Sequence, residues 1–240
     1  MFNEFRPFYQ LNKPKGRRLV ISDIHGCYGT LLDLIQKIQL TKADQLFFLG
    51  DFIDRGPLSA AVLDYILNLH ELGFQVHPSR GNHEEMLLDS AKLDAKNTLM
   101  QYLDFNNTKD LLDARREINA KYIKFMENLP YYYELEDFFL VHAGLNFNCK
   151  APLKAYDDML WVRDFTPNKH FLKNRKLIHG HTPTSLNIIK EAIYNAYSVI
   201  PLDNGCVFYQ NVVAIEGYEI GNLLCLDLDT FELHIQPYND

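Results

Sequence analysis

The chain has 240 residues, of which 47% are hydrophobic and 23% charged, and this is the profile of a compact globular protein with a substantial core. Its formal net charge of −7 argues against a broad cationic surface, so we expect it to bind neither duplex nucleic acid nor an anionic membrane. We expect a single domain over residues 1–240.

Targeting and redox signals are sparse. Residues 1–18 mix charged and apolar side chains and offer no signal-peptide core, and no run is long enough to span a bilayer. The cysteines form no C-x-x-C pair. We therefore expect a cytoplasmic protein with free thiols, and the sequence indicates no oligomeric state.

The first half of the chain predicts a βαβ unit. Residues 17–23 and 45–51 are short apolar runs that each end at a carboxylate, as buried strands do before a turn. Between them, apolar residues recur at three- and four-residue steps, which predicts an amphipathic helix. A second helix over 58–72 stops at Gly73, a third strand covers 74–77, and a polar turn follows at 80–84.

Helical and then strand patterns fill the second half. Residues 85–129 are largely helical, and the apolar spacing is clearest over 118–129. Strands follow from residue 131 onward, and the last two form a hairpin around Thr230. Parallel βαβ units first and antiparallel strands later predict an α/β protein with a mixed sheet, or two packed sheets, and helices outside.

Potential metal ligands follow the predicted strands. Asp23 and His25 are two residues apart on extended chain, so both can face one ion, although an N-cap Asp beside a surface His explains this pair better when it is taken alone. Asp51 and Asp54 flank a strand end in GDFIDRG, where turn chemistry accounts for one carboxylate but not for two beside Arg55.

Three more sites extend the pattern. Asn82 and His83 stand in GNHE, where one side chain can face a metal while the other moves protons. His142 in LVHAG and His181 in IHGHT each end an apolar run. A lone His there is usually structural, but five such sites at strand ends together predict an active site.

The ligand types favour borderline or hard ions such as manganese, iron or zinc over soft metals. With Asp51 bridging, Asp23 and His25 complete one site, and Asn82, His142 and His181 complete the other. Six ligands therefore suffice for two divalent ions, with open positions for water and phosphate.

The ordered motifs SDIHG, GDFIDRG, RGNHE, HAG and GHT, together with LWVR, resemble the phosphoprotein phosphatase family of calcineurin-like metallophosphoesterases, bacterial and phage type. The resemblance covers residues 18–208 and implies two central mixed β-sheets flanked by helices (an α/β/β/α sandwich), with two metals, manganese foremost, bound by the six ligands above. It also implies that His83 is the proton donor, oriented by Asp54, and that Arg55 and Arg163 clamp the phosphate.

As a mechanistic hypothesis, two ions about 3.5–4 Å apart share a hydroxide that attacks phosphorus directly. The function this favours is a serine/threonine protein phosphatase acting on a phosphoprotein or a phosphorylated small molecule. The alternative is a symmetrical diadenosine polyphosphate hydrolase, and a remote one is a metal-binding scaffold without turnover.

Some residues depart from the pattern or compete with it. Ser22 replaces a commoner Gly, and residues 203–206 vary the usual Asp-Thr-Gly turn. His179 precedes His181 by two residues and competes for the ligand role, although the family pattern favours His181. Cys27 adjoins the first motif, where it is either a small buried filler or an oxidation-sensitive group.

Overall fold

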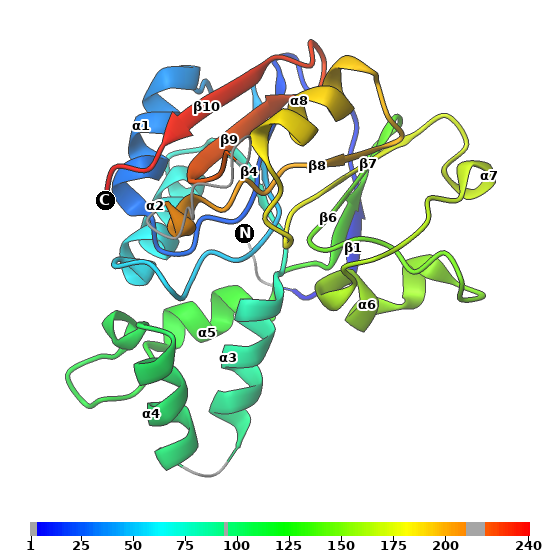
Figure 1. Cartoon of the computed structure of the whole chain (residues 1–240). Coiled ribbons are helices and arrows are strands. Elements are labelled where there is room, and N and C mark those ends of the chain that lie inside the picture. Colours follow the sequence, from blue (N-terminus) through cyan, green and yellow to red (C-terminus); the bar gives the residue numbers. More distant parts are fainter. Residues whose placement is uncertain (1–3, 94–95, 210–218) are drawn as a thin grey trace.

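The computed structural model describes residues 4–93, 96–209 and 219–240. Two five-stranded sheets pack against each other, and helices cover their outer faces (Figure 1). This confirms the predicted α/β fold of two mixed sheets flanked by helices. Within the described ranges, we find no helix with the length and apolar content needed to cross a bilayer.

The first sheet contains the predicted βαβ unit. Its strands, in order across the sheet, are β10 (Leu233–Pro237), β9 (Asn222–Asp227), β2 (Arg18–Ile21), β3 (Gln45–Phe48) and β4 (Gln75–Pro78). Strands β2, β3 and β4 are parallel, with α1 (Tyr28–Ile38) and α2 (Ser59–Glu71) between them in the chain. Strands β9 and β10 form the predicted antiparallel hairpin.

The second sheet differs from the prediction in strand direction. Its strands, in order, are β1 (Phe8–Gln10), β5 (Tyr132–Glu134), β6 (Phe138–Val141), β7 (Lys176–His179) and β8 (Val199–Pro201). Only β5 and β6 are antiparallel; β7 runs parallel to β6, and β8 parallel to β7. The expectation of later antiparallel strands is wrong here, because long crossovers return the chain in the same direction.

The crossovers contain helices. Between β6 and β7 lie α6 (Tyr156–Trp161), α7 (Lys169–Leu172) and a 3₁₀ turn (Pro152–Lys154). Between β7 and β8 lies α8 (Leu186–Tyr194), and a second 3₁₀ turn (Cys206–Phe208) follows β8. The sequence analysis predicted none of these elements, nor strands β1 and β8.

Successive residues of the strands point alternately to two different core layers. In β2, Leu19 and Ile21 pack toward α1 and α2, while Val20 joins the layer between the two sheets. In the second sheet, Leu140 faces the same layer and Val141 faces the outer layer with α6 and α7. Because successive strand residues point to opposite faces, strands buried on both faces read as continuous apolar runs.

A helical insertion over residues 82–127 projects from the sheets (Figure 1). It contains α3 (Asn82–Lys92), α4 (Lys96–Phe105), a 3₁₀ turn (Lys109–Leu111) and α5 (Ala120–Glu127), which matches the predicted helical stretch. Residues 94 and 95 of that stretch lie outside the described residues. The turn expected at 80–84 is wrong, because α3 starts at Asn82, where the Glu84 carboxylate accepts the backbone N–H of the N-cap residue Gly81.

Candidate metal centre

The predicted ligands lie together where strands of both sheets end. Asp23 and His25 follow β2, Asp51 follows β3, Asn82 follows β4, His142 follows β6 and His181 follows β7. Every one of these side chains is buried. Parallel strands present their carboxyl ends at one edge of a sheet, so residues distant in the chain meet there.

Asp51 stands between two groups of ligand atoms. On one side, its Oδ2 lies 3.4 Å from His25 Nε2 and 4.0 Å from His83 Nε2. On the other side, its Oδ1 lies 3.5 Å from His142 Nε2. Two sets of potential ligands, one with His25 and His83 and one with His142 and His181, therefore share Asp51, as expected of a bridging carboxylate.

The second group is the tighter of the two. Asn82 Oδ1 lies 2.9 Å from both His142 Nε2 and His181 Nδ1, and these two nitrogens are 3.2 Å apart. The backbone N–H of His181 donates to both oxygens of Asp23, at 3.0 and 3.1 Å. A Cβ on Gly180 would overlap the Asp23 carboxylate, so only glycine permits this approach.

The backbone contacts of His142 and His25 fix the tautomers of their rings, and in His142 this leaves a nitrogen lone pair facing an oxygen lone pair. His142 Nδ1 donates to Leu49 O at 2.8 Å, and His25 Nδ1 donates to Ile53 O at 2.8 Å, so Nε2 of each ring is an acceptor. His142 Nε2 then faces the Asn82 oxygen, acceptor against acceptor. A cation between these atoms would relieve the repulsion, so the donor set fits a bound metal.

Protonation of the histidine rings would not replace a metal cation here, because the buried rings take up a proton only at low pH. Burial lowers the pKa of His181 to about 2, and burial together with the nearby Arg55 charge lowers the pKa of His25. His181 Nε2 is buried and has no hydrogen-bond partner among the described residues. Burial also raises the pKa of Asp51, and a divalent ion would favour its ionised form instead.

Four of the site residues have a left-handed backbone conformation, as do described residues elsewhere such as Gln39. His25, Asp51, Asp54 and His181 have φ values of 48°, 53°, 73° and 69°, a left-handed conformation that such side chains seldom adopt. Residues persist there when the surrounding structure holds them, and such positions cluster at functional sites.

His83 is held by a buried hydrogen-bond network. Its Nδ1 lies 2.6 Å from Asp54 Oδ2, as the resemblance predicts, which leaves Nε2 facing the cluster. The Tyr102 hydroxyl donates to the same oxygen at 2.5 Å, and Thr108 Oγ1 donates to the other Asp54 oxygen. Neither Tyr102 nor Thr108 belongs to a motif, so the sequence carried no signal for their place in this network.

Glu84 is a further residue without an assigned role in the sequence analysis. Its carboxylate accepts the backbone N–H groups of Asp51, Phe52 and Gly81 at 2.8 to 2.9 Å. Glu84 is the last residue of the RGNHE motif, and this position was the one sequence signal that pointed to it. Glu84 therefore ties the Asp51 loop to the start of α3 and positions Asp51 without facing the ligand cluster itself.

The two expected phosphate clamps border the cluster. Arg55 is exposed, and its Nη1 donates to His25 Nε2 at 2.5 Å. Arg163 is also exposed and follows α6, and its charge contributes to the lowered pKa of His181. The ring centroid of Trp161, two residues before Arg163, lies 6.4 Å from that of His181. Both arginines are therefore exposed near the cluster, and the Arg55 guanidinium also stacks on Phe208 at 5.1 Å.

His179 and Cys27 lie close to the site residues but belong to neither ligand group. His179 Nδ1 lies 3.1 Å from Gly180 O, and its ring packs against Phe165 at 5.5 Å, so His181 rather than His179 faces Asn82. Cys27 is fully buried and forms no disulfide, and its thiol donates to His25 O at 3.6 Å, so it fills a small space next to the site.

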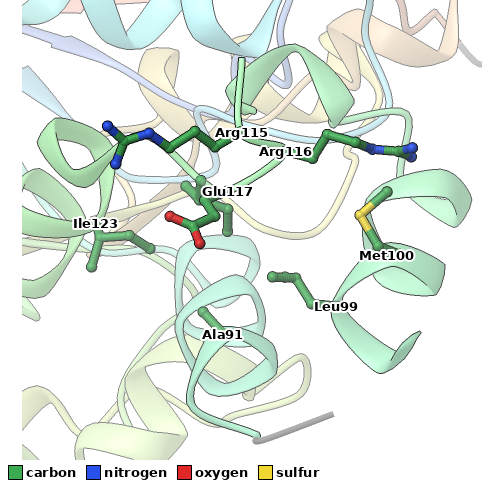
Figure 2. A pocket seen from close by; sticks show the side chains of 8 residues that line it. Ala91, Leu99, Met100, Arg115, Arg116, Glu117 and Ile123 are labelled. Atoms are coloured by element: carbon green, nitrogen blue, oxygen red, sulfur yellow. The ribbon is translucent and has the colours of Figure 1, made fainter. Parts of the chain in front are cut away.

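A separate hollow of about 480 Å³ lies in the helical insertion. Figure 2 shows Leu99 and Met100 from α4 on one side and Ile123 on the other, with Glu117 between them and Arg115 and Arg116 above. The lining contains no histidine and a single carboxylate, so it does not resemble a metal site. We therefore place the chemistry at the ligand cluster around Asp51.

Comparison with known proteins agrees with this geometry. Residues 16–215 match the family model of the calcineurin-like phosphoesterases. The bis(5'-nucleosyl)-tetraphosphatase PrpE [asymmetrical] of Bacillus velezensis is 29% identical over 218 residues, covering 79% of this chain and 84% of that protein. The symmetrical bis(5'-nucleosyl)-tetraphosphatase of Dechloromonas aromatica is 34% identical, but over only 52% of this chain and 42% of its own length.

Solved structures share the fold at low identity. A putative diadenosine tetraphosphatase superposes with a TM-score of 0.68 at 18% identity, over 98% of this chain and all (100%) of that one. A serine/threonine phosphatase of Saccharomyces cerevisiae gives 0.65 at 17% identity, over 100% of this chain and 85% of that one. Because the family model covers most of the sequence, the chain belongs to the calcineurin-like phosphoesterase family.

Proposed function

We propose that the protein is a metal-dependent hydrolase of dinucleoside polyphosphates that cleaves near one end of the polyphosphate. The observation that supports this is the similarity to asymmetrical bis(5'-nucleosyl)-tetraphosphatases over 84 to 91% of the length of two Bacillus proteins. The similarity to symmetrical enzymes covers about half of the chain. The serine/threonine phosphatase that the motifs favoured is therefore not our leading proposal. A dinucleoside polyphosphate hydrolase, the alternative, takes its place, but with asymmetrical cleavage instead of the symmetrical cleavage that the sequence suggested.

The proposed metal sites use the predicted ligands. Asp23, His25 and Asp51 would hold one divalent ion, and Asp51, Asn82, His142 and His181 the other. Two such ions supply a nucleophilic hydroxide at neutral pH and stabilise charge on the phosphoryl group. The oxygen and imidazole donors suit manganese, with iron or zinc as alternatives. The free thiols fit the cytoplasmic location that we expect.

The remaining residues bind and orient the substrate. Arg55 and Arg163 offer guanidinium groups that can bind phosphoryl oxygens through paired hydrogen bonds. His83, fixed by Asp54, would give a proton from Nε2 to the departing oxygen. Water adds to phosphorus as the bridging P–O bond breaks, and cleavage at the terminal phosphorus of diadenosine tetraphosphate yields AMP and ATP.

The test compares two substrates under one set of conditions. The purified protein, reloaded with manganese, is given diadenosine tetraphosphate or a phosphoserine peptide, and a chelator-treated sample serves as the control. We expect the dinucleotide to be consumed with the larger kcat/KM, with AMP and ATP as products. Hydrolysis of the peptide alone would make the serine/threonine protein phosphatase the better assignment. A metal-loaded protein that is inactive on both substrates would favour the metal-binding scaffold without turnover.

A further inference from the structure

Phe105 is an unusually exposed aromatic residue at the end of α4. Its side chain is 90% exposed, although the residue belongs to a helix that packs on α3 in the helical insertion. A single exposed apolar side chain needs no explanation by itself. What makes this one informative is its position relative to the proposed phosphate clamp.

The chain around Phe105 is fixed to the loop that carries Arg55. The next residue, Asn106, accepts the backbone N–H of Arg55 at 2.7 Å, and Asn107 Nδ2 donates to Gly56 O at 3.2 Å. Consecutive Cα atoms are about 3.8 Å apart, so Phe105 is one residue step from this contact. The ring therefore emerges at the border of the site.

The orientation of α4 supports the same placement. Tyr102, three residues before Phe105, reaches Asp54 and the backbone carbonyl of His83 with its hydroxyl group. Helix residues three apart lie on the same side of a helix. Phe105 thus leaves α4 on the side that faces the cluster, one turn beyond Tyr102. The hollow in the insertion is lined by Leu99 and Met100, which lie earlier in α4 (Figure 2).

We propose that Phe105 stacks on a nucleobase of the dinucleoside polyphosphate whose phosphates are held at Arg55. This inference rests on the proposed function and adds a residue that would distinguish nucleotides from other phosphorylated compounds. An aromatic ring beside a cationic phosphate contact is the combination that proteins use to bind nucleotides without reading the base. Phe105 would therefore favour base-bearing substrates but would not select among bases.

The test compares three variants with the wild type. Phe105→Ala removes the ring, Phe105→Tyr retains it, and Tyr194→Ala removes an equally exposed aromatic residue (89%) from α8, away from the insertion (Figure 1). For each, kcat and KM are measured on diadenosine tetraphosphate with manganese bound. Inorganic phosphate, as a competitive inhibitor, is the probe that lacks a base.

For Phe105→Ala we expect KM for the dinucleotide to rise roughly 5- to 100-fold, the range of one base–aromatic stack, with kcat largely retained. The inhibition constant of phosphate should stay near that of the wild type. Phe105→Tyr and Tyr194→Ala should both behave as the wild type.

Two results would overturn the inference. An unchanged KM in Phe105→Ala would show that the ring does not contact the base, and an equal weakening of phosphate would indicate a general disturbance of the Asp54 loop. In both cases the wild type still cleaves the dinucleotide, so the proposed function stands. A wild type that does not cleave it overturns the proposed function and this inference together.

Discussion

The hydroxyl group of Tyr102 donates a 2.5 Å hydrogen bond to the Asp54 oxygen that also faces His83 Nδ1. Burial and the Asp54 charge raise the pKa of Tyr102, so the hydroxyl group stays protonated and remains a donor. The helical insertion is thereby linked to the proposed proton donor by one buried contact.

Tyr102→Phe should lower kcat by about tenfold, with little change in KM. Residues that orient a functional group by hydrogen-bonding to its partner usually contribute about that much. Steady-state kinetics on diadenosine tetraphosphate measure this. Tyr65→Phe, which removes a hydroxyl group from α2 away from the site, is the matched control. Equal losses of kcat in both variants would mean that the Tyr102 hydroxyl group does not support His83 specifically.

The proposed role of His83 predicts a dependence on the leaving group. His83→Asn should reduce turnover by roughly 10²- to 10⁴-fold on a phosphoserine peptide, whose alkoxide needs a proton. The loss on diadenosine tetraphosphate should be smaller, because a phosphate anion is a better leaving group. His234→Asn, on β10, is the control. Equal losses on the two substrates would contradict the assignment of His83 as the acid.

The position of Asp51 between the two ligand groups predicts its role in metal retention. Asp51→Asn should lose bound metal, because the amide lacks the charge that a bridging ligand supplies. Elemental analysis after extensive dialysis gives the metal content. Asp44→Asn, which changes a buried carboxylate outside the cluster, should keep the wild-type content. An Asp51 variant that retains two ions would exclude the bridging role.

Asp44 predicts a pH-dependent contribution to stability. Burial acts to raise its pKa, but hydrogen bonds from Arg17 and Thr41 outweigh burial and lower it from 3.8 to about 2. The folded state therefore binds the proton less tightly, and the stabilisation is present above the unfolded pKa and lost as pH falls toward 2. Asp44→Asn should cost about 1–2 kcal/mol at neutral pH, after allowance for the partly exposed Arg17.

Thermal unfolding of the wild type and the Asp44 variant across acidic pH checks this. The difference in melting temperature should narrow between the two pKa values, 3.8 and about 2. A difference that stays constant through that range would mean that the ionisation of Asp44 does not stabilise the fold.

The motifs predicted the ligand cluster because each of them marks the end of a buried strand. Apolar runs locate β2, β3 and β6, and the residue after each run must lie at a sheet edge. The same local information misled at Asn82, where the polar residues of a predicted turn proved to be the first turn of α3. Polar residues are common in turns and at helix starts alike.

Other features depended on long-range contacts that periodicity does not encode. Tyr102 is 48 residues from Asp54, and its helix signal says nothing about which residue its hydroxyl reaches. Strands β1 and β8 have three residues each, too short for an alternating pattern. The missed helix α8 did carry a signal, since Leu186, Ile189 and Ala192 recur at three-residue steps and are buried.

Anomalous scattering from manganese-soaked crystals tests most directly whether two cations share Asp51. We predict two peaks, one beside Asp51 and His25 and the other beside Asp51 and His142. A single peak, or peaks only at other positions on the protein, would contradict it.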